Sequence, residues 1–356
     1  MSWFLAFAGF AMLIILHEAG HFVAAKAVGM KVEKFYLFFP PKLAAVKRGE
    51  TEYGIGAIPL GGFVKITGMT PDEEVPPEDA HRGYYAQPVW KRIVVIAAGP
   101  IVNVLIAFVI LFLLAQSVDQ PSRAVESVEP RSPAATVLEP GDELLAVDGV
   151  RGDFLDLREQ IATHECAGDQ QEDGCVATTP AQLTILRDGR EITRSIRPEY
   201  DAELDRPLLG YVPGTEPLNL SLGESAERSG DFMWEVTTST VGVIARIFDA
   251  EQREQISSVV GSYEVTRQAI EFDAERALLL LAVISLSLAI INLFPFLPLD
   301  GGHIFWSLVE KVRGTPVPFR VMERASVVGF VLVLMLFAVG LSNDIDRLTG
   351  DGFDVR

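Results

Sequence analysis

The sequence predicts a polytopic α-helical membrane protein with about four transmembrane helices, a cytoplasmic loop rich in β-strand and one extracytoplasmic domain. Two observations support this prediction. Four apolar runs are each long enough to span a bilayer, which takes about 20 helical residues. The charges are also segregated, because residues 118–276 hold 32 acidic residues, 14 arginines and no lysine. Such asymmetry indicates segments that face different compartments.

The four spans are predicted at residues 1–28, 90–117, 277–309 and 319–342. A cleaved signal peptide is the alternative for the first span, but that run lacks a basic start and a small-residue cleavage site. The whole chain has a net charge of −18, which argues against a nucleic-acid partner. Membrane lipid and membrane proteins are the expected partners instead.

The positions of lysine and arginine orient these spans. Seven basic residues lie in the loop 29–89, and three more lie within residues 310–320, where the last two spans are connected. Loops of this kind stay in the cytoplasm. The acidic middle of the chain, both termini and the tail at 343–356 are therefore expected on the outer side of the membrane.

The first span contains the motif His17-Glu18-Ala19-Gly20-His21. His17 and His21 are four residues apart, so they share one face of a helix and together can bind one Zn²⁺ ion. Glu18 lies beside the metal in this pattern, where a carboxylate acts as a general base. Ionisable side chains inside a spanning helix are costly and usually mark function. The alternative is a polar cluster satisfied by neighbouring helices.

A third ligand is expected from the end of the third span. Asp300 follows a segment with Pro295 and Pro298 and precedes two glycines, which together interrupt a regular helix. Such a break at membrane depth is tolerated only inside protein or beside a cavity. His303 is the competing ligand. By helical rise, His17 lies about 21 Å from the outer end of its span, toward the cytoplasmic side.

These paired motifs resemble the site-2 protease family of intramembrane zinc metalloproteases. The likeness is closest to the bacterial regulator of sigma-E protease and its actinobacterial relatives. Further similar stretches begin at Pro59 (Pro-Leu-Gly-Gly-Phe-Val-Lys) and at Ala98 (Ala-Gly-Pro-Ile-Val-Asn), and the resemblance covers nearly the whole chain. One departure is visible, because the second proline of the segment before Asp300 is shifted by one residue, to Pro298.

The resemblance implies that His17, His21 and Asp300 bind one Zn²⁺ per chain and that Glu18 is the catalytic base. It implies that Asn292 helps to hold substrate. The implied substrate is a single-span membrane protein, such as an anti-sigma factor, that a site-1 protease has already trimmed outside. The implied location is a bacterial inner or plasma membrane, with the active site toward the cytoplasm.

The loop 29–89 is expected to contain β-hairpins, because residues 43–67 combine β-branched residues with turn residues. An exposed strand edge there can accept an unwound substrate by strand addition. Gly61, Gly62 and Phe63 are the predicted substrate-binding residues of this loop, as the resemblance also implies. The alternative is that the two glycines only form a turn.

Residues 122–200 resemble a PDZ domain, with a hairpin turn expected at Asp188-Gly189. PDZ domains can bind peptides at a sheet edge, and in this family they are thought to exclude bulky ectodomains. Within this domain, Cys166 and Cys175 are expected to form a disulfide if the region is extracytoplasmic, with two free thiols as the alternative. Residues 201–276 are expected to be an extracytoplasmic amphipathic connector. Amphipathic helices at the outer membrane surface are expected in residues 217–276, with an ordinary connector as the alternative.

The predicted function is therefore intramembrane zinc proteolysis, with two alternatives. A catalytically silent scaffold would recruit partners through the PDZ-like domain, but such a protein has no use for Glu18. A zinc transporter would need several ion sites along a path, and the sequence shows one.

Overall fold

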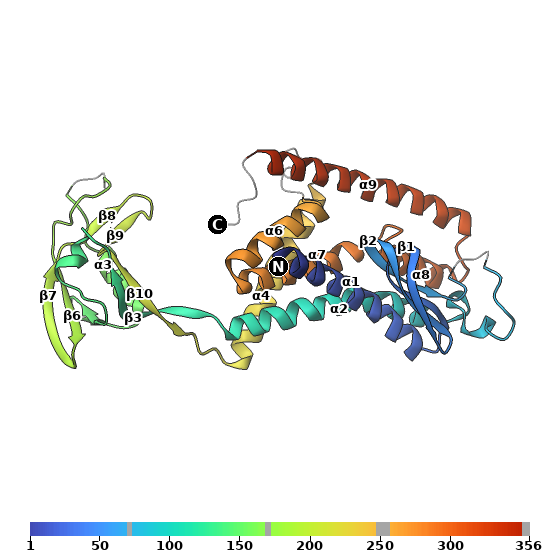
Figure 1. The fold of residues 1–356 in the computed structure, drawn as a ribbon, viewed down its shortest axis with the longest axis horizontal. Helices are drawn as coiled ribbons and strands as arrows, with labels where there is room; N and C mark the ends of the chain where they lie inside the picture. Colours follow the sequence, from blue (N-terminus) through green and yellow to red (C-terminus); the bar gives the residue numbers. More distant parts are fainter. Residues whose placement is uncertain (70–72, 168–171, 247–256, 351–356) are drawn as a thin grey trace. The chain divides into compact units, whose positions relative to one another are not determined.

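The computed structural model describes residues 1–69, 73–167, 172–246 and 257–350. The chain divides into two compact units. Met1–Ala115 and Ser221–Arg356 form the first unit, which contains the long helices, and Gln116–Leu220 form the second, which contains most of the strands (Figure 1).

Within the described part of the chain, four helices of the first unit are long and apolar enough to cross a membrane. They are α1 (Ser2–Ala27), α2 (Val89–Gln116), α7 (Ala274–Asn292) and α9 (Phe319–Thr349). This number confirms the four expected spans. Many apolar side chains of these helices are exposed in the protein alone, as expected of surfaces that face lipid rather than water.

Two long strands follow α1, namely β1 (Val32–Arg48) and β2 (Thr51–Ile66). Both strands bend, so residues 34–37 pair with residues 62–65 on one side and with residues 52–55 on the other. The second half of β1 pairs with the first half of β2 through a tight hairpin. The expected strands are present, but they begin at Val32 rather than near residue 43. Among the described residues, 62–66 have a strand partner on one side only and therefore form an edge.

Two short 3₁₀ turns, η1 (Ala80–Arg82) and η2 (Tyr84–Ala86), connect this sheet to α2. Tyr84 is fully buried and belongs to a core that joins the ends of α1 and α2 to the sheet. The other members of that core include Met30, Val32 and Ile66. The loop between the first two spans is therefore a packed structure anchored to both of them.

The predicted third span is divided in two. Helix α7 ends at Asn292, and α8 (Asp300–Arg313) begins after the proline-containing segment 293–299. The last helix also differs from prediction, because α9 continues to Thr349 and so includes the first residues of the predicted tail. The apolar composition stops near residue 342, which marks the end of the apolar stretch but not of the helix. Residues 351–356 lie outside the described residues.

Two further helices, α4 (Leu222–Ala245) and α6 (Val259–Phe272), lie in the segment where the sequence predicted amphipathic helices. Helix α4 packs Phe232, Met233 and Val236 against the core between α2 and α7. Helix α6 contacts α1, α7 and α9. The apolar faces of both helices are thus buried, at least in part, against the spans.

The second unit contains an antiparallel sheet with the strand order β10-β3-β4-β6-β7, and β5 pairs with β4. A helix, α3 (Phe154–Ala162), and buried side chains such as Leu144, Leu157 and Leu183 complete its core. The remaining elements are β3 (Asp119–Val128), η3 (Pro133–Thr136), β4 (Glu143–Val147), β5 (Val150–Arg151), β6 (Ala181–Arg187), β7 (Arg190–Ile196), β8 (Glu199–Asp201), β9 (Arg206–Leu208) and β10 (Tyr211–Pro217).

This unit is longer than the predicted 122–200, because β10 pairs with β3 and brings residues 211–217 into the sheet. The turn between β6 and β7 has positive φ at both Asp188 and Gly189, as the predicted Asp-Gly hairpin requires. Cys166 and Cys175 are joined in a disulfide, with their Cα atoms 6.2 Å apart.

Candidate metal centre

His17 and His21 lie one turn apart on α1, and both side chains are buried. Their Nε2 atoms are 3.2 Å apart. The two imidazoles therefore point their nitrogens at a common position, as the four-residue spacing predicted.

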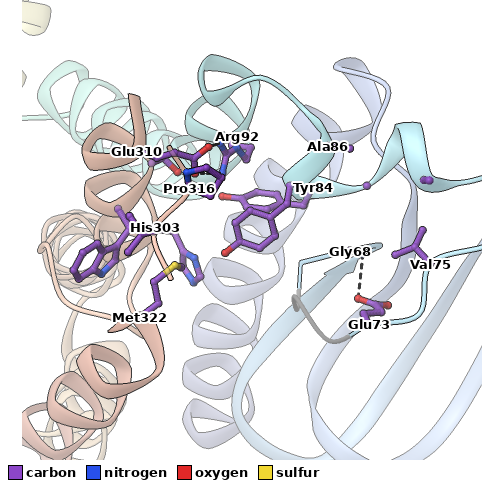
Figure 2. A pocket seen from close by; sticks show the side chains of 16 residues that line it. Gly68, Glu73, Val75, Tyr84, Ala86, Arg92, His303, Glu310, Pro316 and Met322 are labelled. Atoms are coloured by element: carbon purple, nitrogen blue, oxygen red, sulfur yellow. Dashed lines mark hydrogen bonds and ion pairs between the residues drawn. The ribbon is translucent and has the colours of Figure 1, made fainter. Parts of the chain in front are cut away.

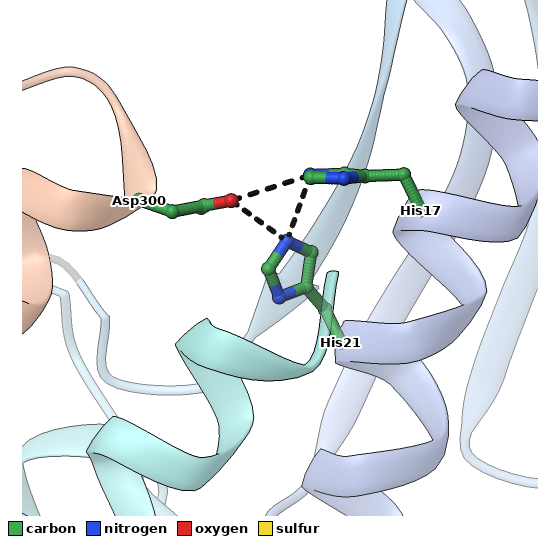
Figure 3. A group of neighbouring side chains, drawn as sticks. All are labelled: His17, His21 and Asp300. Atoms are coloured by element: carbon green, nitrogen blue, oxygen red, sulfur yellow. Dashed lines mark hydrogen bonds and ion pairs between the residues drawn. The ribbon is translucent and has the colours of Figure 1, made fainter. Parts of the chain in front are cut away.

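Asp300 reaches the same position from the first turn of α8. Its Oδ2 lies 3.2 Å from Nε2 of His17 and 3.3 Å from Nε2 of His21 (Figure 3). Donor atoms held about 2.0–2.1 Å from a tetrahedral zinc ion are about 3.3 Å from one another. The three measured separations fit the edges of such a ligand shell. Among the described residues, this is the one group of His, Cys, Asp and Glu with metal-ligand spacing.

The tautomer of His21 also suits a ligand. Its Nδ1 lies 2.9 Å from the backbone oxygen of Val95 on α2, a partner that can only accept. Nδ1 therefore carries the proton and donates it to this carbonyl, which leaves the lone pair of Nε2 directed at His17 and Asp300.

A glycine on α2 makes room for both imidazoles. A Cβ atom at Gly99 would lie 2.3 Å from Nε2 of His21 and 2.9 Å from Cε1 of His17. On the facing helix, a Cβ atom at Gly20 would lie 2.6 Å from the backbone oxygen of Ala98. Any larger residue at these two positions would force α1 and α2 apart or displace the ligands. The Ala-Gly-Pro stretch was recognised in the sequence, but this role was not predicted.

Two glycines of α8 allow the broken segment to fold tightly over the helix start. A Cβ at Gly301 would lie 2.1 Å from the oxygen of Leu293, and one at Gly302 would lie 2.5 Å from the nitrogen of Leu297. On α9, a Cβ at Gly329 would lie 1.7 Å from the oxygen of Leu297. These contacts fix the position of Asp300 relative to α7 and α9.

Glu18 is half-buried on α1 and interacts electrostatically with His17, His21 and Asp300. The edge strand of the sheet passes directly beside it. A Cβ atom at Gly62 would lie 2.9 Å from Cγ of Glu18 and 3.3 Å from Ile14. Glycine is therefore needed where β2 crosses α1, and the unpaired edge lies next to the candidate base.

Ion pairs hold the sheet against the end of α1. Glu50, in the turn between β1 and β2, accepts hydrogen bonds from Arg82 at 2.7 and 2.9 Å and also pairs with Lys26 of α1. The hydrogen bonds from Arg82 and from Lys26 lower the pKa of Glu50 to about 2. The carboxylate therefore remains charged at neutral pH, and the sheet keeps its position beside Glu18.

The structure also places the predicted substrate-binding residues and the competing ligand. Phe63 stacks on Tyr36, with ring centroids 5.2 Å apart, and Gly61 lies against the ring of Phe39. Asn292 is half-buried at the end of α7, before the broken segment. His303, the competing ligand, is not part of the three-residue group and instead lines a neighbouring cavity.

Comparison with known proteins decides the family. The model of peptidase family M50 matches residues 5–336. The chain belongs to peptidase family M50.

The relatives of this M50 peptidase carry consistent names. A protein of Clostridium perfringens named as a "putative zinc metalloprotease" is 30% identical over 348 residues, which cover 96% of this chain and 97% of the relative. Zinc metalloprotease Rip1 of Mycobacterium tuberculosis is 31% identical over 365 residues, which cover 90% of this chain and 88% of Rip1. The chain is thus a zinc metalloprotease and a multi-pass membrane protein, which favours neither the scaffold nor the transporter alternative.

Proposed function

We propose that this M50 peptidase is an intramembrane protease that cleaves single-span membrane proteins within or near their transmembrane segments. His17, His21 and Asp300 are the proposed zinc ligands, and Glu18 is the proposed general base. The observation that carries the proposal is the convergence of the three side chains, within 3.3 Å of one another, from two apolar regions of the chain.

In the proposed reaction, three residues hold the metal and Glu18 transfers the proton. A zinc ion held by the three side chains lowers the pKa of a water molecule toward about 7. The Glu18 carboxylate accepts a proton as water oxygen attacks the peptide carbonyl carbon. It then donates this proton to the leaving nitrogen as the C–N bond breaks. Val95 holds His21 in the tautomer that this arrangement needs.

The edge at residues 62–66 is the proposed binding site for the substrate backbone. A helical substrate hides its peptide groups in internal hydrogen bonds, so it must unwind before hydrolysis. An unpaired strand edge can satisfy the unwound peptide groups by strand addition. Because Gly62 lies against Glu18, a strand added there would carry its peptide bonds past the base. Asn292 and Phe63 are further proposed substrate-binding residues.

The topology and the second unit complete the proposal. The basic loop between α1 and α2 lies in the cytoplasm, and both termini and the acidic second unit lie outside. We assign that unit as PDZ-like, supported by its five-stranded order, its edge strand β10 and its helix α3. A disulfide there suits an extracytoplasmic location. The resemblance to the sigma-E regulators favours a pre-trimmed anti-sigma factor as substrate.

One experiment tests the catalytic assignment. The purified protein is reconstituted with a single-span substrate that contains helix-destabilising residues, and wild type is compared with Glu18→Gln. General-base catalysis contributes about 10²–10⁴-fold, so cleavage should fall by that factor. Zinc content should stay at one per chain, because Glu18 is not a ligand. Undiminished cleavage by Glu18→Gln would contradict the assignment.

A further inference from the structure

A cavity of about 430 Å³ (Figure 2) is lined in part by α8, the helix that begins at Asp300. Its walls come from Gly68, parts of residues 73–86, the first turn of α2, the helix α8, residues 316–317 and the start of α9. Its volume lies in the range of about 300–1,000 Å³ that is usual for sites that bind small molecules or short peptide segments. None of the residues that line it belongs to the proposed zinc ligands.

Helix α8 connects the cavity to the metal centre. Asp300, His303, Ser307 and Glu310 are spaced by three or four residues, so they lie on one face of this helix. Asp300 reaches the metal centre, and the other three line the cavity. By helical rise, the cavity begins about 5 Å from the level of Asp300 and extends to about 15 Å.

The edge strand leads to the same place. Gly62 lies against Glu18, and Gly68, two residues after the end of β2, lines the cavity. A peptide that follows this edge away from Glu18 therefore arrives at the cavity. Since α8 ends in Lys311 and Arg313, this direction leads toward the cytoplasm in the proposed topology.

The wall contains a buried donor that needs an acceptor. Arg92 is 2% exposed, and its two terminal nitrogens donate to Glu310 at 3.0 and 2.6 Å. Its Nε is buried and has no hydrogen-bond partner among the described residues. A carbonyl oxygen of a bound ligand would satisfy Nε, which protein groups otherwise leave unpaired.

The charges and the remaining wall exclude a simple anion as the preferred occupant. Glu310 already neutralises Arg92, and Glu73 pairs with Lys65 at 2.8 Å. Tyr85, Trp306 and Met322 add aromatic and apolar surface. A neutral ligand with carbonyl acceptors and an apolar side chain fits this combination, and an extended polypeptide has both.

We propose that this cavity is a substrate subsite, which binds the unwound substrate on the cytoplasmic side of the scissile bond. The proposal rests on the proposed proteolytic function and adds a specificity determinant to it. Arg92 Nε donates to a substrate carbonyl, and an apolar side chain occupies the space between Trp306 and Met322. With about 3.3 Å per extended residue, the cavity corresponds to positions roughly two to five residues from the scissile bond.

Photo-crosslinking tests this assignment independently of catalysis. Benzoylphenylalanine is placed at single positions of a model single-span substrate, and each version is bound to the Glu18→Gln enzyme. Wild-type enzyme and mass spectrometry locate the cut. Positions two to five on the cytoplasmic side should form adducts with residues 80–86 or 303–322, whereas positions on the other side should not. Substrate that wild type cleaves but that forms adducts only elsewhere would overturn the subsite.

A pair of variants tests specificity. Ser307 lines the cavity and is 5% exposed, whereas the neighbouring Leu308 is exposed and lies outside the lining. Substrates are compared that have Trp or Ala two to five residues from the scissile bond, on its cytoplasmic side. Ser307→Phe should lower kcat/KM for the Trp substrates at least 10-fold more than for the Ala substrates. Leu308→Phe should leave that ratio unchanged.

If both variants fold and have the same ratio of kcat/KM for Trp-containing to Ala-containing substrates, the proposal is overturned. If Ser307→Phe loses zinc or does not fold, the positions of the photo-crosslinked adducts alone test whether the cavity binds substrate. If wild type cleaves no substrate of the panel and no adduct forms, the proteolytic proposal fails together with the subsite.

Discussion

Asp300 and Asp344 are two carboxylates enclosed by the apolar helices of the first unit, and their surroundings differ in kind. Asp344, on α9, is fully buried and accepts hydrogen bonds from Ser257 Oγ at 2.7 Å, Ser258 N at 2.8 Å, Ser258 Oγ at 2.5 Å and Gly261 N at 2.9 Å. The oxygen of Asp300 that enters the metal centre faces two imidazole nitrogens and has no conventional hydrogen-bond donor among the described residues.

Asp344 has the surroundings of a structural carboxylate, whereas those of Asp300 suit the proposed metal ligand. Asp344 satisfies free N–H groups at the start of α6 and so joins α9 to that helix, as a capping residue does. A Cβ atom at Gly261 would lie 2.2 Å from its Oδ1, so glycine permits this contact. Asp300 satisfies no helix end. A buried carboxylate oxygen without such donors favours a neighbouring cation, which agrees with the proposed role of Asp300 as a zinc ligand.

The largest expected effect is that of removing Asp300. Asp300→Ala should lose bound zinc, from one per chain to background, and should lose detectable cleavage. The reason is that two histidines alone leave the ion without its third protein ligand. Elemental analysis of the purified protein and cleavage of a reconstituted substrate measure the two effects. Asp300→Ala that keeps one zinc per chain would contradict the ligand assignment.

Removing Asp344 should affect stability rather than zinc. Asp344→Ala leaves several buried donors unpaired and should lower the free energy of unfolding by about 2–3 kcal/mol. Thermal unfolding in detergent measures this loss, and zinc content should remain at one per chain. The matched control is Asp346→Ala, which removes an exposed carboxylate from the same helix and should have little effect. Equal zinc loss in the variants of Asp300 and Asp344 would remove the distinction between them.

The smallest expected effect comes from reshaping the space around the ligands. Gly99→Ala brings a methyl group against His21 and His17 and should lower zinc affinity about 10–100-fold, as changes that disturb ligand orientation do. Competition with a chelator measures the affinity. The control is Gly230→Ala on α4, where a Cβ meets no atom within 4 Å and the helix gains up to about 1 kcal/mol. The same affinity in both variants would show that Gly99 does not shape the centre.

The sequence predicted the candidate centre better than it predicted its support. His17 and His21 follow from helical spacing, and Asp300 follows from a carboxylate in a proline-broken segment. The roles of Val95 and Gly99 were not predictable, since they depend on which face of α2 meets α1. The contact of Asp344 with Ser258 joins residues 86 positions apart, and no local pattern predicts such a contact.

The β-strands likewise include features that the sequence predicted and features that it did not. Composition predicted strands between the first two spans, and it also predicted the turn at Asp188 and Gly189. It did not predict that both strands bend so that residues 34–37 gain partners on two sides, nor that β10 joins the sheet of the second unit. Register between distant segments is set by packing, which sequence periodicity alone does not contain.

The sequence by itself determined the chemistry of this protein: four apolar spans, a histidine pair with its glutamate, and an aspartate on a broken helix. These features are local, because composition and spacing along a single segment produce them. Only the tertiary structure decided which carboxylate lies beside the two histidines, which strand edge passes Glu18 and where a cavity adjoins α8. The physical reason is that each of these depends on close contacts between helices and strands that are far apart in the chain.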